Sequence, residues 1–172
     1  INANAITKGN KTRLLNFSEI EHPLALQIGG SDPKLLAEAT KIGVDWGYDE
    51  INLNVGCPSS RVSSGDFGAV LMKRKDHVAK CVDAMAQFSS NVPISVKCRI
   101  AVDDQDPEKI LPSFIKTVSN SGVSIFIIHA RKAILSGLSP KDNRKIPPID
   151  YNLVKKIKAQ FPQLEICLNG EI

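Results

Sequence analysis

The feature that most constrains this chain is a regular alternation of short apolar runs with amphipathic stretches. Five apolar runs, rich in Ile, Leu and Val, lie at residues 24–29, 51–56, 94–100, 124–129 and 165–169. Their composition is typical of strands buried on both faces. Alternating strands and helices predict a parallel sheet, because each crossover helix returns the chain to the same end. We expect one α/β domain whose sheet is either an open doubly wound sheet or a barrel.

Four helices are predicted between these strands. Aspartate–proline pairs at residues 32–33 and 106–107 indicate helix starts, since Asp caps free N–H groups and Pro suits the first helical position. Asp76 and Asp150 predict two more starts. Apolar residues follow each start at three- to four-residue spacing, and the stripe after Asp76 runs from Val78 to Phe88. The remaining stretches at 59–66, 101–106 and 132–149 are predicted loops.

Every predicted strand carries polar side chains towards its C-terminal end. In chain order they are Gln27, Asn52 with Asn54, Lys97 with Arg99, His129 with Arg131 just beyond, and Asn169. The active site of a parallel barrel lies at this end of its strands. One such residue is equally well explained as a solvated strand end. The same pattern on five strands predicts a binding site.

These residue types suit an anionic ligand that contains a ring. The amides of Gln27 and Asn169 can pair with a planar heterocycle. Lys97 can stabilise negative charge on a reduced flavin ring, and His129 can hydrogen-bond to a ring or a phosphate. No GxGxxG motif follows a strand, and carboxylates are scarce at the strand ends. A Rossmann site, glycosidase chemistry and a magnesium site are therefore not indicated, and no His or Cys spacing predicts a metal.

Cys57 differs from the other cysteines in its position. It follows Gly56 at the end of a predicted strand and precedes Pro58, so its thiol is expected to face the site from a stiff turn. That position suits a proton donor or a nucleophile. The remaining cysteines, which fit small apolar core positions instead, are Cys81, Cys98 and Cys167.

Five segments resemble, in the right order, motifs of the tRNA-dihydrouridine synthase family. They are LQIGG at 26–30, DEINLNVGCPS at 49–59, VKCRI at 96–100, IHARKA at 128–133, and LSGLSPKDNR at 135–144 followed by IPP. The last segment is similar to the A subfamily. The resemblance implies a TIM-type (β/α)8 barrel that carries FMN, of which about five strands are present, followed by a small helical domain that helps to hold tRNA. It also implies the reaction, in which NADPH reduces the flavin, hydride passes to C6 of a uridine, and a cysteine protonates C5.

The same resemblance assigns roles to individual residues. Cys57 matches the general acid. The positions assigned to FMN are Gln27, Lys97, His129, Asn169, Gly170 and Glu171. The positions assigned to tRNA are Asn54, Arg99, Arg131, Lys141 and Arg144. A cationic loop at 141–145 would grip the phosphates that flank a uridine turned out of its stack, and the A-subfamily likeness indicates a D-loop uridine.

Three positions depart from the family pattern. Glu171 stands where a second glycine is usual, Ala101 where the A subfamily typically has glycine, and Ser60 where aspartate is frequent. The carboxylate and Cβ of Glu171 are expected to weaken the binding of the flavin phosphate. The first and last barrel strands and the helical domain are expected to be absent from residues 1–172. We therefore interpret the chain as the central part of the barrel, with open sheet edges and poor FMN binding by itself.

The net charge of +4 and a pI near 8.9 are compatible with tRNA as the partner. We expect no DNA partner, no membrane association and a monomer. No apolar run approaches the roughly 20 residues of a membrane span, and no leader peptide is evident. The expected location is the cytoplasm, or an organelle if a transit peptide precedes Ile1.

Three other functions are compatible with these residues. A related barrel that reduces a small pyrimidine or an enoate would share Lys97 and Asn169 but would not need the cationic loop. A non-catalytic tRNA-binding paralogue would keep the loop without flavin, and would not depend on Cys57. A Schiff-base aldolase would use Lys97, for which the sequence offers only a lysine at a strand end.

Overall fold

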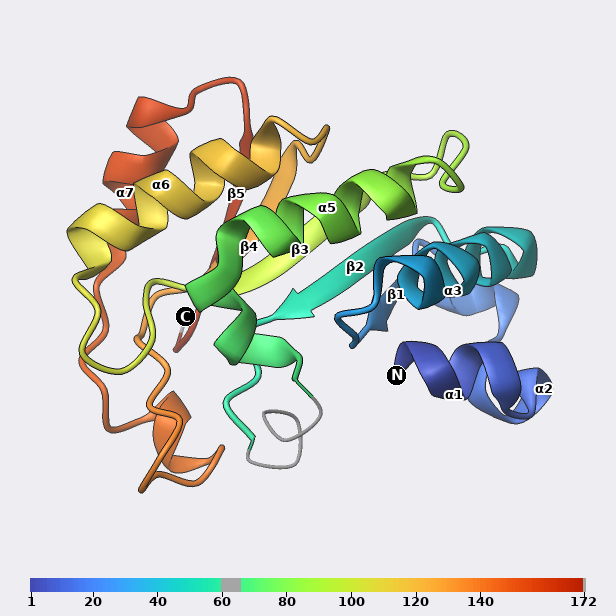
Figure 1. Ribbon diagram of the computed structural model, residues 1–172, viewed down its shortest axis with the longest axis horizontal. Helices are drawn as coiled ribbons and strands as arrows, with labels where there is room; N and C mark the ends of the chain where they lie inside the picture. The colour runs from blue at the N-terminus through green and yellow to red at the C-terminus, as the bar shows by residue number, and fades with distance from the viewer. Residues whose placement is uncertain (60–65, 172) are drawn as a thin grey trace.

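The computed structural model describes residues 1–59 and 66–171. Five strands are present, and the helices alternate with them along the chain (Figure 1). The strands are β1 (Ala25–Ile28), β2 (Glu50–Val55), β3 (Ile94–Arg99), β4 (Ile125–His129) and β5 (Glu165–Asn169). The α-helices are α1 (Ala3–Lys8), α2 (Lys11–Leu15), α3 (Pro33–Trp46), α5 (Lys75–Ala86), α6 (Pro107–Ser119) and α7 (Tyr151–Gln160). Short 3₁₀ helices are η1 (Glu19–Glu21), η2 (Gly68–Arg74) and η3 (Asp142–Arg144).

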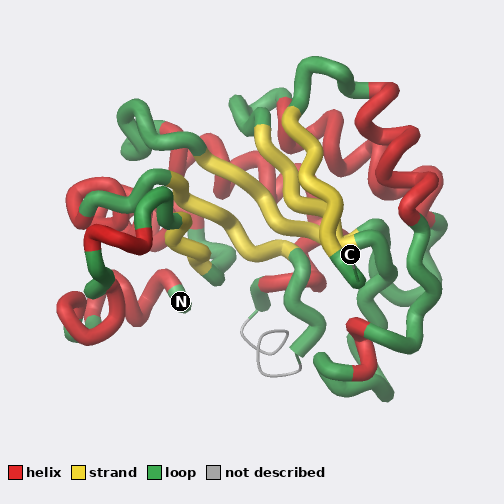
Figure 2. Tube along the Cα trace, turned by 180° about the vertical axis from the view of Figure 1, so that it is seen from behind, coloured by secondary structure: helices red, strands yellow, loops and turns green. Residues whose placement is uncertain are grey.

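The sheet has the strand order β1-β2-β3-β4-β5, and every pair is parallel. Crossovers between adjacent parallel strands are almost always right-handed, so an order that never reverses puts every crossover helix on one face. The contacts agree, since α3 packs on α5, α5 on α6, and α6 on α7. Figure 2 shows the strands from the opposite side, in front of these helices. A doubly wound sheet would reverse its order and carry helices on both faces. The fold is therefore five consecutive strands of a TIM-type (β/α) barrel.

The predicted helix starts at the aspartates are confirmed with one change. Asp32, Asp106 and Asp150 are N-caps whose side chains accept hydrogen bonds from N–H groups of the first turn of α3, α6 and α7. Asp76 instead lies inside the first turn of α5, which begins at Lys75. The prediction that Phe88 belongs to the apolar face of this helix was wrong. The helix ends at Ala86, and Phe88 is 45% exposed.

One face of the sheet packs against the helices and forms the core. Every second side chain of a strand points to this face, because successive strand residues point to opposite faces of the sheet. The buried residues on this face are Leu26, Ile28, Ile51, Leu53, Val55, Val96, Cys98, Phe126 and Ile128. The prediction that all strands are buried on both faces holds for most of β2 and β3. It fails for β1 and β5, where Ala25, Gln27 and Glu165 are exposed.

The opposite face of the sheet carries the polar positions. The parallel register sets Gln27 beside Asn52, Asn52 beside Ser95, and Asn54 beside Lys97. Nearer the C-terminal ends, Arg99 lies beside His129, which in turn lies beside Asn169. Residues from all five strands therefore converge at one end of one face. None of the helices described in the structure is both long and apolar enough to cross a membrane.

Candidate functional site

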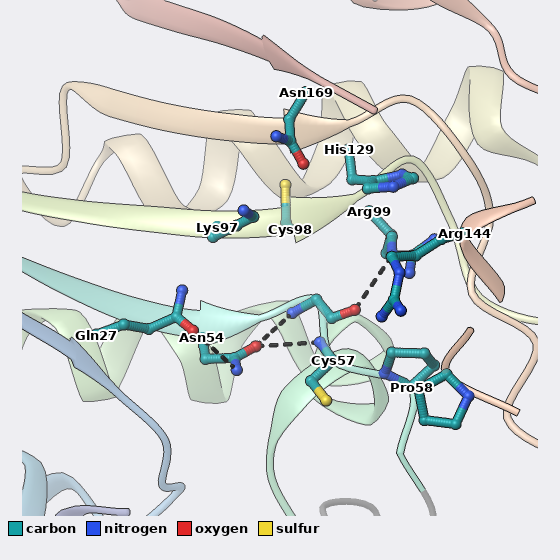
Figure 3. Close-up of a pocket in the computed structure, with 12 residues that line it drawn as sticks. Gln27, Asn54, Cys57, Pro58, Lys97, Cys98, Arg99, His129, Arg144 and Asn169 are labelled. Carbon is teal, nitrogen blue, oxygen red and sulfur yellow. Dashed lines mark hydrogen bonds between the residues drawn. The ribbon is translucent and has the colours of Figure 1, made fainter. Parts of the chain in front are cut away.

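A cavity of about 260 Å³ lies at the C-terminal ends of the strands (Figure 3). Eight of the residues that the sequence assigns to the site line it: Gln27, Asn54, Cys57, Lys97, Arg99, His129, Arg144 and Asn169. Gly56, Pro58, Cys98 and Pro140 complete the lining. The structure therefore brings these eight residues together at one cavity, and their roles in binding or catalysis stay predictions. Four assigned residues lie around the cavity rather than in its wall: Arg131, Lys141, Gly170 and Glu171.

The turn after β2 holds Cys57 in place. The Asn54 Oδ1 atom accepts hydrogen bonds from the backbone N–H groups of Gly56 and Cys57, each at 3.0 Å (Figure 3). The Cys57 carbonyl accepts from the Ala69 N–H at 2.9 Å, which ties the turn to η2. Pro58 then fixes the backbone on the other side. The cysteine is half-buried and free, with its position set by local hydrogen bonds.

The other cysteines are in different surroundings. Burial raises the pKa of Cys98 to about 12 and that of Cys81 to about 11, so both remain protonated and enclosed near neutral pH. Cys167 lies two residues before Asn169, on the face of the sheet opposite the helices (the inner face), and its thiol contacts Glu165 Oε1 at 3.7 Å. Only Cys57 combines a position at the cavity with an ordered turn.

Three cations surround the cavity, and they differ in how they are held. No hydrogen bond or ion pair of the Lys97 ammonium group is found among residues 1–59 and 66–171, and this side chain lines the cavity. Arg144 reaches the cavity from η3, on the exposed loop. Arg99 is 4% exposed, and burial lowers its pKa to about 10, which still leaves it charged at neutral pH.

The Arg99 guanidinium joins three backbone segments. Its Nε donates to the Gly56 carbonyl at 3.2 Å, and its Nη1 donates to the carbonyls of Lys132 at 3.3 Å and Asn143 at 2.9 Å. These bonds connect the Cys57 turn with the loop at 132–149. The predicted contact of Arg99 with tRNA stays a prediction, because its donors are bound to protein carbonyls here.

His129 is a buried, neutral ring. Burial lowers its pKa to about 4, with further lowering by Arg99, Arg131 and Lys97. Its Nδ1 atom is buried and has no hydrogen-bond partner within the described part of the chain. Gly170 lies against this ring with φ +108°, and a Cβ at that position would lie 3.1 Å from His129 Cε1. Glycine at this position therefore lets the backbone pass close to the imidazole, whose Nδ1 stays unpaired within the described ranges.

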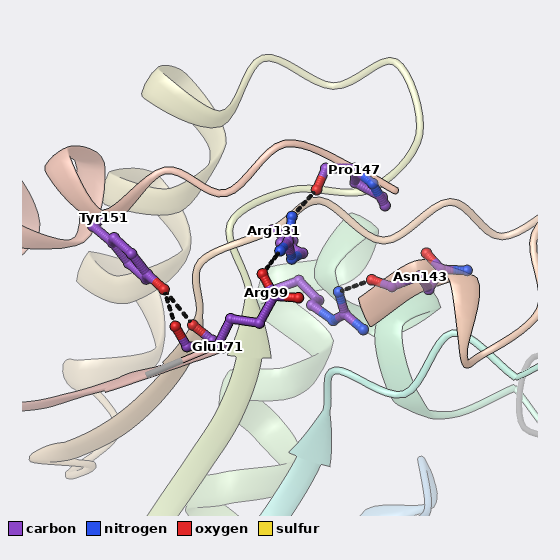
Figure 4. A network of polar contacts seen from close by, with 7 residues as sticks. Arg99, Arg131, Asn143, Pro147, Tyr151 and Glu171 are labelled. Atoms are coloured by element: carbon purple, nitrogen blue, oxygen red, sulfur yellow. Dashed lines mark hydrogen bonds and ion pairs between the residues drawn. The ribbon is translucent and has the colours of Figure 1, made fainter. Parts of the chain in front are cut away.

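Arg131 and Glu171 form an ion pair at the edge of the site (Figure 4). The Arg131 guanidinium is buried and also donates to the Pro147 carbonyl. Glu171 has φ +47°, in the left-handed region, and the Tyr151 hydroxyl lies 2.7 Å from the Gly170 carbonyl and 2.6 Å from the Glu171 carbonyl. The carboxylate expected to repel a phosphate is thus directed at a cation. The predicted tRNA contact of Arg131 stays a prediction.

The loop at 132–149 is organised around Asn143, a residue to which the sequence gives no individual role. Its side chain is fully buried, and its Oδ1 accepts from the Ile134 N–H at 2.7 Å. Its Nδ2 donates to three carbonyls, the shortest bond being 2.9 Å to Ile134. Lys141 and Arg144 flank this buried amide and are exposed. An asparagine within a run of charged residues, next to Asp142 and Arg144, was the available sequence signal.

Two further assigned features fall elsewhere. Ala101 is buried and its carbonyl accepts from the Ala133 N–H at 2.9 Å, so it serves the loop framework. Ser60 and most of the predicted loop at 59–66 lie outside the described residues. No group of three or more His, Cys, Asp or Glu side chains suited to a metal occurs within the described ranges.

Comparison with known proteins identifies the family of the chain. The family model described as Dihydrouridine synthase (Dus) matches residues 1–172. The chain belongs to the dihydrouridine synthase family. Relatives in this family are similar over the whole chain. A tRNA-dihydrouridine(20/20a) synthase of Synechocystis sp. is 57% identical over 172 residues, which are 100% of this chain and 51% of that protein.

Two more members of the dihydrouridine synthase family give the same picture. Proteins named tRNA-dihydrouridine(20/20a) synthase from Xanthomonas campestris pv. campestris and Escherichia coli (strain K12) are 50% and 55% identical, over 100% of this chain and 51% and 50% of their own lengths. The chain spans about half the length of these curated relatives. A crystal structure of TcOYE with pHBA has a TM-score of 0.46 and 8% identity over 79% of this chain and 44% of that chain.

Proposed function

We propose that the full-length gene product reduces a uridine of tRNA to 5,6-dihydrouridine, with FMN as the cofactor and NADPH as the reductant. The observation that carries the proposal is the cavity itself. Cys57 stands on an ordered turn at the same opening as Lys97, His129 and Asn169. These are the side chains required to hold a planar anionic ring and to deliver a proton beside it.

The residues present fit FMN. The buried Nδ1 of His129 has no hydrogen-bond partner among the described residues, and the His129 side chain lines the cavity, so this nitrogen is suited to a hydrogen-bonding ligand. The Lys97 ammonium group lines the cavity and is suited to a ring that becomes negatively charged on reduction. Gln27 and Asn169 add amide groups for the polar edge of the ring. Bound FMN, after reduction by NADPH, would supply the hydride for C6 of the uracil.

Cys57 is proposed to donate the proton to C5. A general acid must be held within reach of the atom it protonates, and the Asn54 cap together with the bond to Ala69 holds this turn. A thiol that has given its proton to C5 must regain one from solvent in each cycle, and the half-buried thiol is open enough for it.

tRNA is the proposed substrate, and the exposed cations of the loop support it. Lys141, Arg144 and Lys145 project from a loop whose backbone is fixed by the buried Asn143. Charges fixed in this way can contact phosphates that flank a uridine turned out of its stack. The relatives' names specify positions 20 and 20a, and we propose a D-loop uridine for this protein as well.

The remaining expectations are part of the same proposal. We propose that this chain forms the central part of the FMN-binding barrel, and that further strands and a helical domain complete the enzyme. The absence of a DNA partner, the monomeric state and the cytoplasmic location stay predictions.

The test is a modification assay on the full-length protein. Unmodified tRNA is incubated with FMN and NADPH, and the digested nucleosides are measured by mass spectrometry. Dihydrouridine is expected from the wild type, with a loss of about 100-fold or more in Cys57→Ala, the range for removing a general acid. Cys167→Ala is the matched control, because it removes a half-buried thiol of the same face that does not line the cavity. It should retain activity.

Other results would contradict the proposal in different ways. Bound flavin without dihydrouridine, combined with reduction of a free pyrimidine or an enoate, would favour the small-molecule reductase. tRNA binding without flavin, unaffected by Cys57→Ala, would favour a non-catalytic tRNA-binding protein. Borohydride trapping of a carbonyl substrate on Lys97 would favour the aldolase.

A further inference from the structure

A relay of side-chain hydrogen bonds, from Asn54 through Gln27, Asn52 and Ser95 to Glu50, runs along the inner face of the sheet from the Cys57 turn. The Asn54 Oδ1 atom accepts from two backbone N–H groups, those of Gly56 and Cys57. A backbone N–H can only donate, so the oxygen of this amide must face the turn and its NH₂ group must face away. Asn54 Nδ2 then donates to Gln27 Oε1 at 3.4 Å, which in turn directs the NH₂ group of Gln27 down the strand (Figure 3).

The chain continues towards the N-terminal end of β2. Gln27 Nε2 donates to Asn52 Oδ1 at 2.8 Å, and Asn52 Nδ2 donates to Ser95 Oγ at 2.6 Å. The Ser95 hydroxyl then donates to Glu50 Oε1. An ionised carboxylate accepts hydrogen bonds and donates none. The Cys57 turn at one end of the relay and Glu50 at the other therefore impose the same donor-to-acceptor direction on the three amides between them.

The middle of this relay is closed to water. Asn52 is 4% exposed and Ser95 is fully buried, so neither can exchange its partner for solvent. Reversing one amide would set oxygen against oxygen on one side and NH₂ against NH₂ on the other. At Asn52 and Ser95 such a mismatch leaves buried polar groups unsatisfied, which is more costly than the bond itself is favourable. The Asn54–Gln27 bond is exposed, and its direction follows from the two N–H groups of the turn. The relay therefore has one stable direction.

We infer that Glu50 is a positioning residue that fixes the direction of the amides lining the cavity, and through Asn54 the placement of the Cys57 turn. The inference rests on the proposed function for its consequence, since Gln27 and Asn54 are the amides offered to the ring and the uridine. Glu50 itself does not line the cavity. Its effect passes through Ser95, Asn52 and Gln27.

The relay decides which atoms of the cavity amides remain for a ligand. Gln27 and Asn54 each keep one N–H outside the relay, and Gln27 also keeps one oxygen lone pair, whereas both lone pairs of Asn54 Oδ1 accept from the turn. With the direction fixed, these free groups point at set places along the cavity wall. Without the carboxylate, the buried hydroxyl of Ser95 loses its acceptor, and the direction of the amides is then imposed from the Cys57 turn alone.

A matched set of variants separates this role from simple packing. Glu50→Gln keeps a carbonyl oxygen for the Ser95 hydroxyl and should preserve the relay. Glu50→Ala removes the acceptor, and Ser95→Ala removes the link while leaving the carboxylate. If all act through one chain, the Glu50→Ala and Ser95→Ala effects should not add in the double variant.

The first readout needs neither flavin nor tRNA. Hydrogen exchange of the full-length protein is followed by mass spectrometry on peptides that contain the N–H groups of Gly56 and Cys57, with a peptide of α6 as an internal reference. The two alanine variants and their double variant should each exchange roughly three- to tenfold faster at the turn, the range for losing one net hydrogen bond, and Glu50→Gln should match the wild type. The α6 peptide should not change.

The second readout uses the full-length holoenzyme and tRNA. Dihydrouridine formation should fall with the same rank order, and Glu50→Gln should rescue it. The relay would be refuted if Glu50→Gln behaved like Glu50→Ala, or if the alanine variants left exchange at the turn unchanged. Faster exchange in all peptides would also overturn it, because it would show a general loss of stability. The expected exchange pattern without any dihydrouridine from the wild type would keep the relay and reject the proposed function.

Discussion

Replacing Asn143 by alanine should release the cationic loop from the barrel. The side chain is fully buried and supplies both the acceptor for the Ile134 N–H at 2.7 Å and a donor to the Ile134 carbonyl at 2.9 Å. Leaving a buried donor or acceptor without a partner costs about 1–3 kcal/mol for each group. The bonds to Leu138 and Ser139, at 3.4 and 3.3 Å, are long and add little.

The expected loss is about 2–4 kcal/mol, because two strongly bonded groups are affected and Ile134 is only half-buried, so water relieves part of the cost. That is a large part of the roughly 5–15 kcal/mol that stabilises a typical domain. Asn152→Ala is the matched control, since Asn152 is exposed on α7 and no side-chain bond to it is found in the described residues.

Two assays on the full-length protein check this estimate. Equilibrium unfolding in urea gives the change in stability, and limited proteolysis reports cleavage within 134–146. Asn143→Ala should be cut in that stretch at lower protease concentration than the wild type or Asn152→Ala. A loss below about 0.5 kcal/mol, the level of an ordinary surface change, together with an unchanged cleavage pattern would refute the reasoning.

Three further predictions follow from the site. Burial lowers the pKa of His129 from 6.5 to about 4. As the pH falls below 6.5, the unfolded chain therefore binds a proton at this residue that the folded chain does not, so the stability present above pH 6.5 is lost progressively towards pH 4. The urea midpoint of His129→Asn should fall less than that of the wild type across the same pH range. Lys141→Ala and Arg144→Ala should each weaken tRNA binding and reduce the slope of log K against log[salt] by roughly 1, whereas Lys80→Ala, an exposed change on α5, should leave the slope unaltered. Arg99→Lys should cost about 2 kcal/mol in urea unfolding, because one ammonium group cannot replace a guanidinium that joins three carbonyls; wild-type stability in this variant would contradict that role.

The elements of this fold could be predicted because their signals are local. The aspartates at 32, 106 and 150 cap helices within their own first turns, and the strands are short apolar runs. The choice between an open sheet and a barrel could not be made from the alternation alone. It depends on the strand order, which the hydrogen-bond pairing supplies. The end of α5 was misplaced because Phe88 continues the apolar spacing two residues beyond the last helical residue.

The sequence predicts where the polar side chains meet better than it predicts their hydrogen-bond partners. Polar strand ends meet at one edge of any parallel sheet, so Lys97, His129 and Asn169 could be brought together from the sequence. The partners of Glu50 and Asn143 could not, because their contacts depend on which atoms of distant segments meet. Ser95 is 45 residues from Glu50, and the carbonyl of Asn143 is 44 residues from Arg99. Such pairs carry no periodic signal.

Arg99 shows how the two functional loops depend on each other. One guanidinium holds the Gly56 carbonyl beside the proposed acid and the Asn143 carbonyl beside the proposed RNA-binding cations. Both carbonyls are therefore placed relative to one rigid, planar group, and Figure 4 shows the bond to the Asn143 carbonyl. A phosphate bound by the loop, as proposed, would then be held at a fixed distance from the Cys57 turn. For the proposed protonation of a tRNA nucleotide this coupling would matter, because a grip that moved independently of the acid would place the base without regard to the thiol.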